Sequence, residues 1–186
     1  MTRLETERLV VRNFVPDDWR DLQALSVQQE QSDLAAYDYE WPTSDEELQD
    51  CARSFSTGES LLAVCLRESG VFIGLISLVR SEQEHGTVFD LGYRFLAAYH
   101  GKGYATEACR AVLDHAFGRL GAHRVSAGTA AANAPSCRLL VRLGFARIAQ
   151  STVWFRRDLE GRPIEFLGHH FELNRDEWHA RRRGRS

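Results

Sequence analysis

The segment that most constrains this chain is a glycine-containing loop, His100–Thr106, that lies between a strand and an amphipathic helix. Thr87–Phe95, before the loop, is an apolar run typical of a strand. After the loop, apolar residues recur every three or four positions over Ala105–Phe117, which predicts a helix packed on one side against a sheet. Arg124–Ala131 follows as the next strand, so we expect a right-handed crossover between two parallel strands.

Apolar runs and turn signals predict further elements on both sides of this unit. Helices are expected from Pro16, from the capping box at Thr43–Glu47 and from Asn133 to the glycine at position 144. The other expected strands are Leu9–Phe14, Leu61–Arg67, Val71–Arg80, Ala146–Arg157 and Ile164–Leu173. This order favours an α/β (α+β) fold, with a mixed sheet that carries helices on both faces.

Length and composition indicate a single domain. With 186 residues, 44% of them apolar, the chain can bury one full core. We expect residues 1–180 to form that domain and the basic residues 181–186 to be a disordered tail. A net charge of -3 does not favour nucleic acid as a partner.

The same sequence lacks the signals of export, membrane insertion and metal binding. No segment resembles a signal peptide or reaches the roughly 20 apolar residues of a membrane span. The four cysteines are scattered without C-x-x-C spacing, which favours reduced thiols and predicts no metal site. We therefore expect a cytoplasmic protein that neither enters a membrane nor requires a metal.

The glycine loop suits a phosphate-bearing ligand, because the start of a helix offers unpaired N–H groups and a positive dipole end. A tight turn without a ligand is the alternative. The loop does not match a Walker motif, since Leu96 occupies the first glycine position and Gly103 follows Lys102. It also fails the dinucleotide fingerprint, whose last glycine is replaced by Thr106.

The loop instead resembles the R/Q-x-x-G-x-G/A loop of GNAT acetyltransferases. A second resemblance follows at that superfamily's spacing, in Asn133-x-x-Ser136 and then Leu139–Phe145. The opening Thr6–Arg12 and the closing Arg175–Trp178 are similar to the RimJ/RimL-like branch, which includes ribosomal-protein N-terminal acetyltransferases. The resemblance implies a mostly antiparallel sheet of six to seven strands, whose central strands are splayed to bind acyl-CoA.

It also implies acetyl-CoA as co-substrate and direct transfer of the acetyl group to a primary amine. Main-chain groups of Tyr93, Arg94 and Phe95 would bind the pantetheine arm, as a missing strand would. Asn133 would contact the CoA arm or simply cap its helix, and Arg142 would assist at the phosphates. The pyrophosphate would be held by the loop that begins at His100, through the amides of Gly101, Lys102, Gly103, Tyr104, Ala105 and Thr106.

Two positions depart from the family pattern. His100 stands where Arg or Gln is usual, which weakens a charged phosphate contact but leaves the main-chain contacts intact. Leu140 replaces the tyrosine acid of many relatives. Ser136, one helical turn from Asn133, is our candidate for the acid that protonates the departing thiolate. Its hydroxyl could equally satisfy amides at the helix start.

An alkyl amine is mostly protonated at neutral pH, so a base or a water relay must remove a proton. The candidates are Asp90 in an apolar strand, Glu40 in the aromatic loop 37–42, and Glu165 near the C-terminal strand. Each could also be an ordinary surface acid, and strand alternation could direct Asp90 to solvent.

Other functions remain open from the sequence. The fold could serve as a non-catalytic acyl-CoA-binding or sensing domain, or the loop around Trp41 could bind a protein partner. The acceptor could be a protein N-terminus or a small-molecule amine, because a fold does not specify a substrate. An exposed edge among the C-terminal strands leaves a homodimer open.

Overall fold

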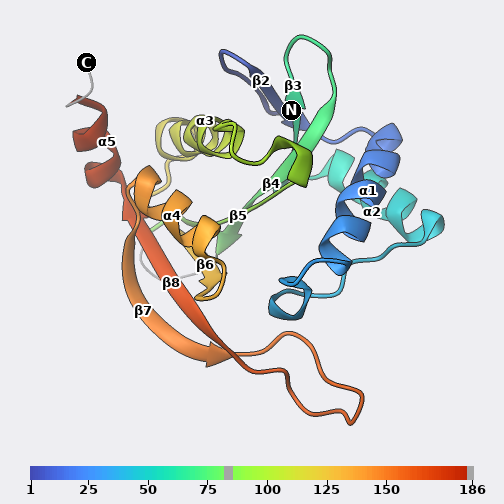
Figure 1. Ribbon diagram of the computed structural model, residues 1–186. Coiled ribbons are helices and arrows are strands. Elements are labelled where there is room, and N and C mark those ends of the chain that lie inside the picture. Colours follow the sequence, from blue (N-terminus) through green and yellow to red (C-terminus); the bar gives the residue numbers. More distant parts are fainter. Residues whose placement is uncertain (82–85, 184–186) are drawn as a thin grey trace.

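Eight strands form one continuous sheet in the order β1-β2-β3-β4-β5-β6-β8-β7 (Figure 1). The computed structural model describes residues 1–81 and 86–183. The strands are β1 (Arg3–Glu5), β2 (Leu9–Asn13), β3 (Leu61–Leu66), β4 (Phe72–Ser81), β5 (Val88–Phe95), β6 (Arg124–Ala130), β7 (Ala146–Val153) and β8 (Phe166–Asn174). All neighbouring strands are antiparallel except β5 and β6, which confirms a mixed, mostly antiparallel sheet.

Within the described residues, five α-helices cover the sheet: α1 (Trp19–Glu30), α2 (Asp45–Thr57), α3 (Tyr104–Gly118), α4 (Ala134–Leu143) and α5 (Arg175–Arg183). Helices α1 and α2 pack against one another at one end of the molecule, and α3 and α4 lie together at the other (Figure 1). Gly144 ends α4 with a positive φ of 108°, as expected. Ser44 precedes α2, but its hydroxyl donates to the Glu47 carboxylate and caps no helix amide, so the expected capping box does not form.

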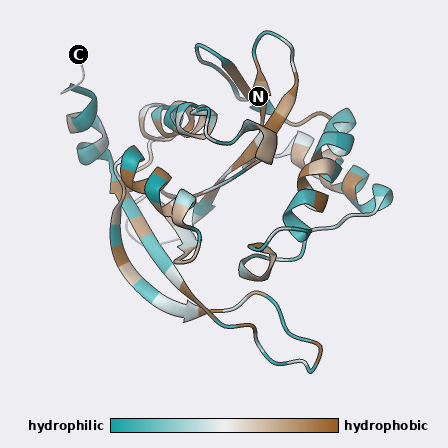
Figure 2. Ribbon diagram, viewed as in Figure 1, coloured by the Kyte–Doolittle hydropathy of each residue, from teal (hydrophilic) through white to brown (hydrophobic). Residues whose placement is uncertain are grey.

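Two apolar cores lie on opposite faces of the sheet. The larger core joins α3 and α4 to strands β4–β6 and β8, through residues such as Leu91, Val112 and Leu140. The smaller core packs α1 and α2 on β3 and β4, through residues such as Leu22, Leu48 and Ala63. Hydrophobic and hydrophilic segments accordingly alternate along both groups of helices (Figure 2). The prediction of helices on both faces is confirmed.

The central strands separate after a short parallel pairing. Only Val88, Phe89 and Asp90 of β5 have partners on β6, which are Arg124, Val125 and Ser126. Beyond Asp90, β5 continues for five residues paired with β4 alone, and β6 continues paired with β8. The edge of each strand that faces the other is therefore free of ladder partners, as the splayed arrangement requires.

Three differences from the sequence prediction have clear physical reasons. The three-residue strand β1 pairs with β2 at the sheet edge and is too short to give a periodic signal. Strand β7 ends at Val153, because the chain then leaves the sheet as an irregular loop that returns at Phe166. Helix α5 includes Arg181–Arg183, which we had assigned to the tail, because Trp178 is 5% exposed and anchors the helix. Residues 184–186 lie outside the described residues.

Candidate active site

The glycine loop forms a cradle of backbone donors at the start of α3. Gly101 and Gly103 adopt positive φ angles of 74° and 84°, a conformation that side-chain-bearing residues avoid. In the part of the chain that the structure describes, no oxygen accepts a hydrogen bond from the N–H groups of residues 101–106. These donors are available to an anion, and binding of a phosphate by this loop stays a prediction.

His100 turns toward the strand rather than toward the loop. Its Nε2 lies 2.9 Å from the carbonyl oxygen of Phe95, at the end of β5. Gln28 of α1 approaches the same carbonyl at 3.3 Å and accepts from the amide of Ala97. His100 therefore fixes the end of β5 relative to the loop. This contact accounts for a histidine at a position where the family pattern has a charged or amide side chain.

The three residues expected to bind pantetheine direct their side chains to opposite faces of the sheet. Tyr93 and Phe95 face the core of α3 and α4, whereas Arg94 faces the side of α1. Their main-chain edge toward β6 is unpaired. The opening between the strands is thus bordered by side chains from both faces.

A hydrogen-bonded hydroxyl pair borders this opening on the α4 face. The phenol oxygen of Tyr93 lies 2.9 Å from Oγ of Ser136 and 3.3 Å from the Ser136 carbonyl oxygen. Burial raises the pKa of Tyr93 well above its ordinary value, and the hydrogen bond to Ser136 opposes this only in part. Both hydroxyls therefore stay protonated near neutral pH. The sequence identified Ser136 but assigned Tyr93 a main-chain role alone.

Asn133 caps α4, as its alternative role predicted. Its Oδ1 accepts a hydrogen bond from the Ser136 amide at 3.2 Å. Because the backbone of Ser136 makes this contact, its hydroxyl is left to Tyr93.

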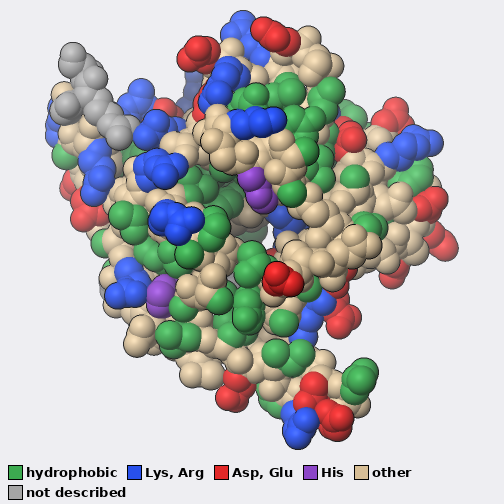
Figure 3. Space-filling view, viewed as in Figure 1, with side chains coloured by type: hydrophobic (Ala, Val, Ile, Leu, Met, Phe, Trp, Pro, Cys, Tyr) green, Lys and Arg blue, Asp and Glu red, His purple; other side chains and the backbone are tan. Residues whose placement is uncertain are grey.

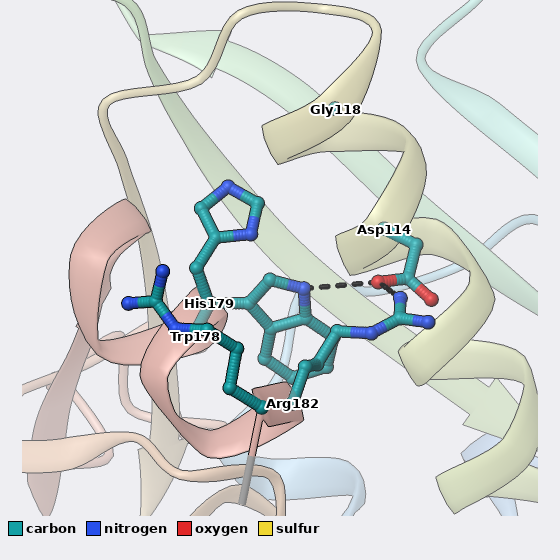
Figure 4. Close-up of a pocket in the computed structure, with 6 residues that line it drawn as sticks. Asp114, Gly118, Trp178, His179 and Arg182 are labelled. Carbon is teal, nitrogen blue, oxygen red and sulfur yellow. Dashed lines mark hydrogen bonds and ion pairs between the residues drawn. The ribbon is translucent and has the colours of Figure 1, made fainter. Parts of the chain in front are cut away.

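Arg142 lies at the other end of α4, nine residues and about 13 Å along the helix from Asn133. There it borders a groove of about 400 Å³. The other residues around the groove are Arg110, Asp114, Leu143, Trp178, Arg181 and Arg182. Figure 4 shows the adjoining pocket, where the Trp178 indole donates to Asp114 at 3.0 Å and Arg182 pairs with the same carboxylate. Arg142 thus lies at the opposite end of α4 from Asn133 and shares a groove with Arg110 of α3.

Asp90 occupies the point at which β5 and β6 separate. Its Oδ2 accepts a hydrogen bond from Oγ of Ser126 at 2.9 Å. Asp90 is exposed as a residue, but neighbouring protein atoms surround its carboxylate and partly desolvate it. This desolvation raises its pKa, while the Ser126 hydrogen bond and the charge of His170 oppose the rise. By alternation along β5, Asp90 shares the face of Arg94 and lies opposite to Tyr93.

Glu40 and Glu165 are exposed residues in two loops that meet beside the opening. The loop that contains Glu40 is held by an ion pair between Asp38 and Arg94, whose guanidinium lies 4.2 Å from the Trp41 ring. Its aromatic residues pack on the segment after β7, with Tyr39 and Phe155 ring centroids 4.5 Å apart. The aromatic loop and the C-terminal segment therefore come together.

The two ends of the molecule enclose a hollow near its centre. Figure 3 shows this hollow between the part that carries α3 and α4 and the part that carries α1 and α2, with hydrophobic side chains along its wall. Within residues 1–81 and 86–183, no cluster of three or more His, Cys, Asp or Glu side chains could hold a metal ion. The helices among these residues are also too short or too polar to span a membrane.

With the glycine loop and the separation of β5 from β6 described, the chain can be compared with known protein families. Residues 8–146 match the family model of the acetyltransferase (GNAT) domain. The chain belongs to the GNAT acetyltransferase family. The chain is similar to an uncharacterised N-acetyltransferase, YnaD, of Bacillus subtilis, with 30% identity over 149 residues. That alignment covers 77% of this chain and 82% of YnaD.

Solved GNAT structures share the whole fold. A GNAT-family acetyltransferase from Bacillus anthracis superimposes with a TM-score of 0.77 at 22% identity, over 94% of this chain and 99% of that one. A ribosomal-protein-S5-alanine acetyltransferase from Vibrio fischeri gives a TM-score of 0.76 at 18% identity, over 96% and 99%. Members of the family use acetyl-CoA as co-substrate, and this GNAT chain is an acyltransferase enzyme.

Proposed function

We propose that this GNAT protein transfers the acetyl group of acetyl-CoA directly to a primary amine. The observation that carries the proposal is the parting of β5 from β6 immediately before a loop of unpaired amides. The parted strands offer main-chain groups to pantetheine, and the loop offers a positive helix end to pyrophosphate. Together they define a channel for a thioester with a charged tail.

The two faces of the opening carry different groups. One face suits protonation of the leaving thiolate, and the other suits removal of a proton from the amine. Attack by a neutral amine on the thioester carbonyl forms the amide bond and expels the CoA thiolate, which gains a proton. The Tyr93–Ser136 pair lies on the face of α3 and α4, where the loop would hold the CoA phosphates. We assign the proton donor to this hydroxyl pair, with Tyr93 supplying the phenol that Leu140 cannot.

We assign the base to Asp90 among the three candidates. It borders the opening on the face that also carries Arg94 and the aromatic loop, where the acceptor would enter. Its raised pKa makes it a better proton acceptor than an ordinary surface aspartate. Glu40 and Glu165 extend from the loops beside the pocket and would attract a cationic amine before it loses its proton.

A protein N-terminus is the acceptor class we favour. The RimJ/RimL-like opening and closing motifs support it, as does the overall likeness to the Vibrio fischeri ribosomal-protein-S5-alanine acetyltransferase. A small polyamine is the second class. A likeness to a spermidine N-acetyltransferase of Vibrio cholerae, with a TM-score of 0.74, supports that alternative.

The first test is calorimetric titration of the protein with acetyl-CoA and with CoA. Saturable one-to-one binding is expected, followed by thiol release when an acceptor is added. Alanine-terminated and serine-terminated peptides, each with an N-acetylated control, are compared with spermidine as acceptors. Absence of binding to both CoA forms would overturn the proposed reaction, and release with spermidine alone would overturn the peptide as acceptor.

A further inference from the structure

We propose that Arg8, on the segment between β1 and β2, is a positioning residue that sets the orientation of the pyrophosphate-binding amides. The inference rests on the proposed function, because it concerns how the glycine loop is prepared for acetyl-CoA. Arg8 lies about ninety residues before the loop in sequence, yet its guanidinium contacts the loop directly.

A carboxylate in the first turn of α3 holds Arg8 in place. Oε2 of Glu107 accepts a hydrogen bond from Arg8 Nε at 2.7 Å and lies 2.6 Å from Nη2. The other oxygen accepts from the Arg8 amide at 2.9 Å and from the Thr6 hydroxyl at 2.6 Å. Four donors from one short segment thus converge on one carboxylate. Because Nε and Nη2 share Oε2 while the backbone amide of the same residue binds Oε1, the guanidinium has little rotational freedom.

The remaining nitrogen of Arg8 acts on the loop. Nη1 donates to the carbonyl oxygen of Lys102 at 3.0 Å. In a trans peptide the C=O and the following N–H point in opposite directions, and the described chain contains no cis peptide. Fixing the Lys102 carbonyl toward Arg8 therefore turns the Gly103 N–H away from Arg8 and into the cradle.

Arg8 also lies close to Gly103 and Tyr104, the residues that follow this carbonyl. A Cβ at position 103 would lie 3.4 Å from Arg8 Nη2, and the guanidinium carbon lies 4.6 Å from the centre of the Tyr104 ring. Arg8 thus covers the outer surface of the loop. Its charge is balanced by Glu107, so its contribution is to geometry rather than to net attraction for phosphate.

The first experiment compares three ligands, two that carry the pyrophosphate and one, pantetheine, that lacks the entire adenosine nucleotide. Calorimetry of the Arg8→Ala variant is carried out with CoA and with dephospho-CoA, which keeps the pyrophosphate and lacks the 3′-phosphate. Pantetheine, which lacks all phosphates, is titrated by NMR. We expect the Kd of both CoA forms to rise about ten-fold, equivalent to ~1.4 kcal/mol, with pantetheine unchanged. Arg3→Ala, which removes an exposed arginine paired with Glu5 on β1, is the matched control.

The pattern across ligands separates the outcomes. Loss of affinity for CoA alone would mean a direct contact with the 3′-phosphate, and equal loss for all three ligands would mean a damaged fold. Either result overturns the positioning role, as would an unchanged Kd. If the wild-type protein binds neither CoA form, the proposed function fails with it. If wild type binds and Arg8→Ala binds equally well, only the role of Arg8 fails.

A second variant tests the sign of the effect. Glu107→Ala removes a negative charge near the pyrophosphate site and releases Arg8 from its clamp. A purely electrostatic role of Arg8, or a direct contact with pyrophosphate, predicts tighter CoA binding in this variant. The positioning role predicts weaker binding, by several-fold, with the affinity for pantetheine retained. Tighter binding would overturn the inference.

Discussion

At the scale of single residues, the site depends on side chains whose roles are set by neighbours distant in sequence. Tyr93 carries a phenol to Ser136, forty-three residues away, and burial keeps that phenol protonated. Asp90, three residues earlier on the same strand, lies on the other face and meets Ser126. One strand therefore carries to opposite faces the two side chains that we propose as acid and base.

The hydroxyl pair gives the first prediction. Tyr93→Phe and Ser136→Ala should each lower kcat about 100-fold if the pair protonates the leaving thiolate. The Kd for acetyl-CoA should change little, because the Asn133 cap bonds the Ser136 backbone. Stopped-flow thiol release and calorimetry measure the two quantities. If both single variants keep the wild-type kcat, the two hydroxyls have only a structural role.

The raised pKa of Asp90 gives a prediction about pH. A base must be deprotonated to act, so kcat/KM should fall as the pH drops through a pKa above the ordinary aspartate value of 3.8. In Asp90→Asn this acid limb should disappear along with most of the activity. Ser126→Ala should shift the limb to higher pH, because it removes a hydrogen bond to the ionised form. An acid limb that persists unchanged in Asp90→Asn would assign the base elsewhere.

The third prediction concerns Gly103, whose φ of 84° is strained for other residues. Gly103→Glu should raise the Kd for acetyl-CoA more than ten-fold, because it adds a charge and disturbs the loop beside the pyrophosphate. Gly118→Glu, near the exposed end of the same helix and with open space around its Cα, is the matched control. Equal Kd values for the two variants would show that the loop does not hold phosphate.

At the scale of elements, local patterns were sufficient for most strands and helices. Period-two alternation and capping residues act over a few positions, so seven of the eight strands and the helices up to α4 could be located, with errors at their ends. Helix α5 escaped notice because its sequence is strongly charged and Trp178 finds its apolar partner, Phe117, only in the folded chain. For the same reason the sequence revealed the glycine loop but not the Arg8–Glu107 clamp.

Helix α4 gives a prediction at this scale. Asn133→Ala removes the N-cap and should lower the free energy of unfolding by about 1 kcal/mol. It should also weaken the Tyr93–Ser136 contact, since the cap positions the first turn of the helix. Arg138→Ala, an exposed site on the same helix, is the control. Chemical denaturation with fluorescence detection measures the difference, and equal stability of the two variants would contradict the capping role.

At the scale of the whole molecule, an ion pair joins the end of α1 to the segment that follows β7. Arg156 donates to both carboxylate oxygens of Glu30 at 2.7 Å, and also to the carbonyl oxygens of Asp38 and Tyr39. These contacts fix the aromatic loop against the segment that follows β7. The proposed acceptor side is therefore assembled from residues more than one hundred positions apart.

This pair predicts a loss of stability in acid. The hydrogen bond from Arg156 lowers the pKa of Glu30 below its ordinary value of 4.5. The stabilisation is therefore complete above about pH 4.5 and is lost as the pH falls through the lower pKa. Glu30→Gln should destabilise the protein at pH 7 and lose less stability than wild type between pH 5 and about pH 3. An equal loss of unfolding free energy in the two proteins over this pH range would contradict the prediction.

The parting of β5 from β6 has one more consequence. In the described sheet, three residue pairs between β5 and β6 are the hydrogen-bonded link between strands β1–β5 and strands β6–β8. A molecule bound between the separated parts of β5 and β6 replaces the missing ladder hydrogen bonds, so its binding free energy also stabilises the folded protein against unfolding. Under the proposed function, the supply of acetyl-CoA would regulate how long each copy of this protein survives, as well as how fast it works.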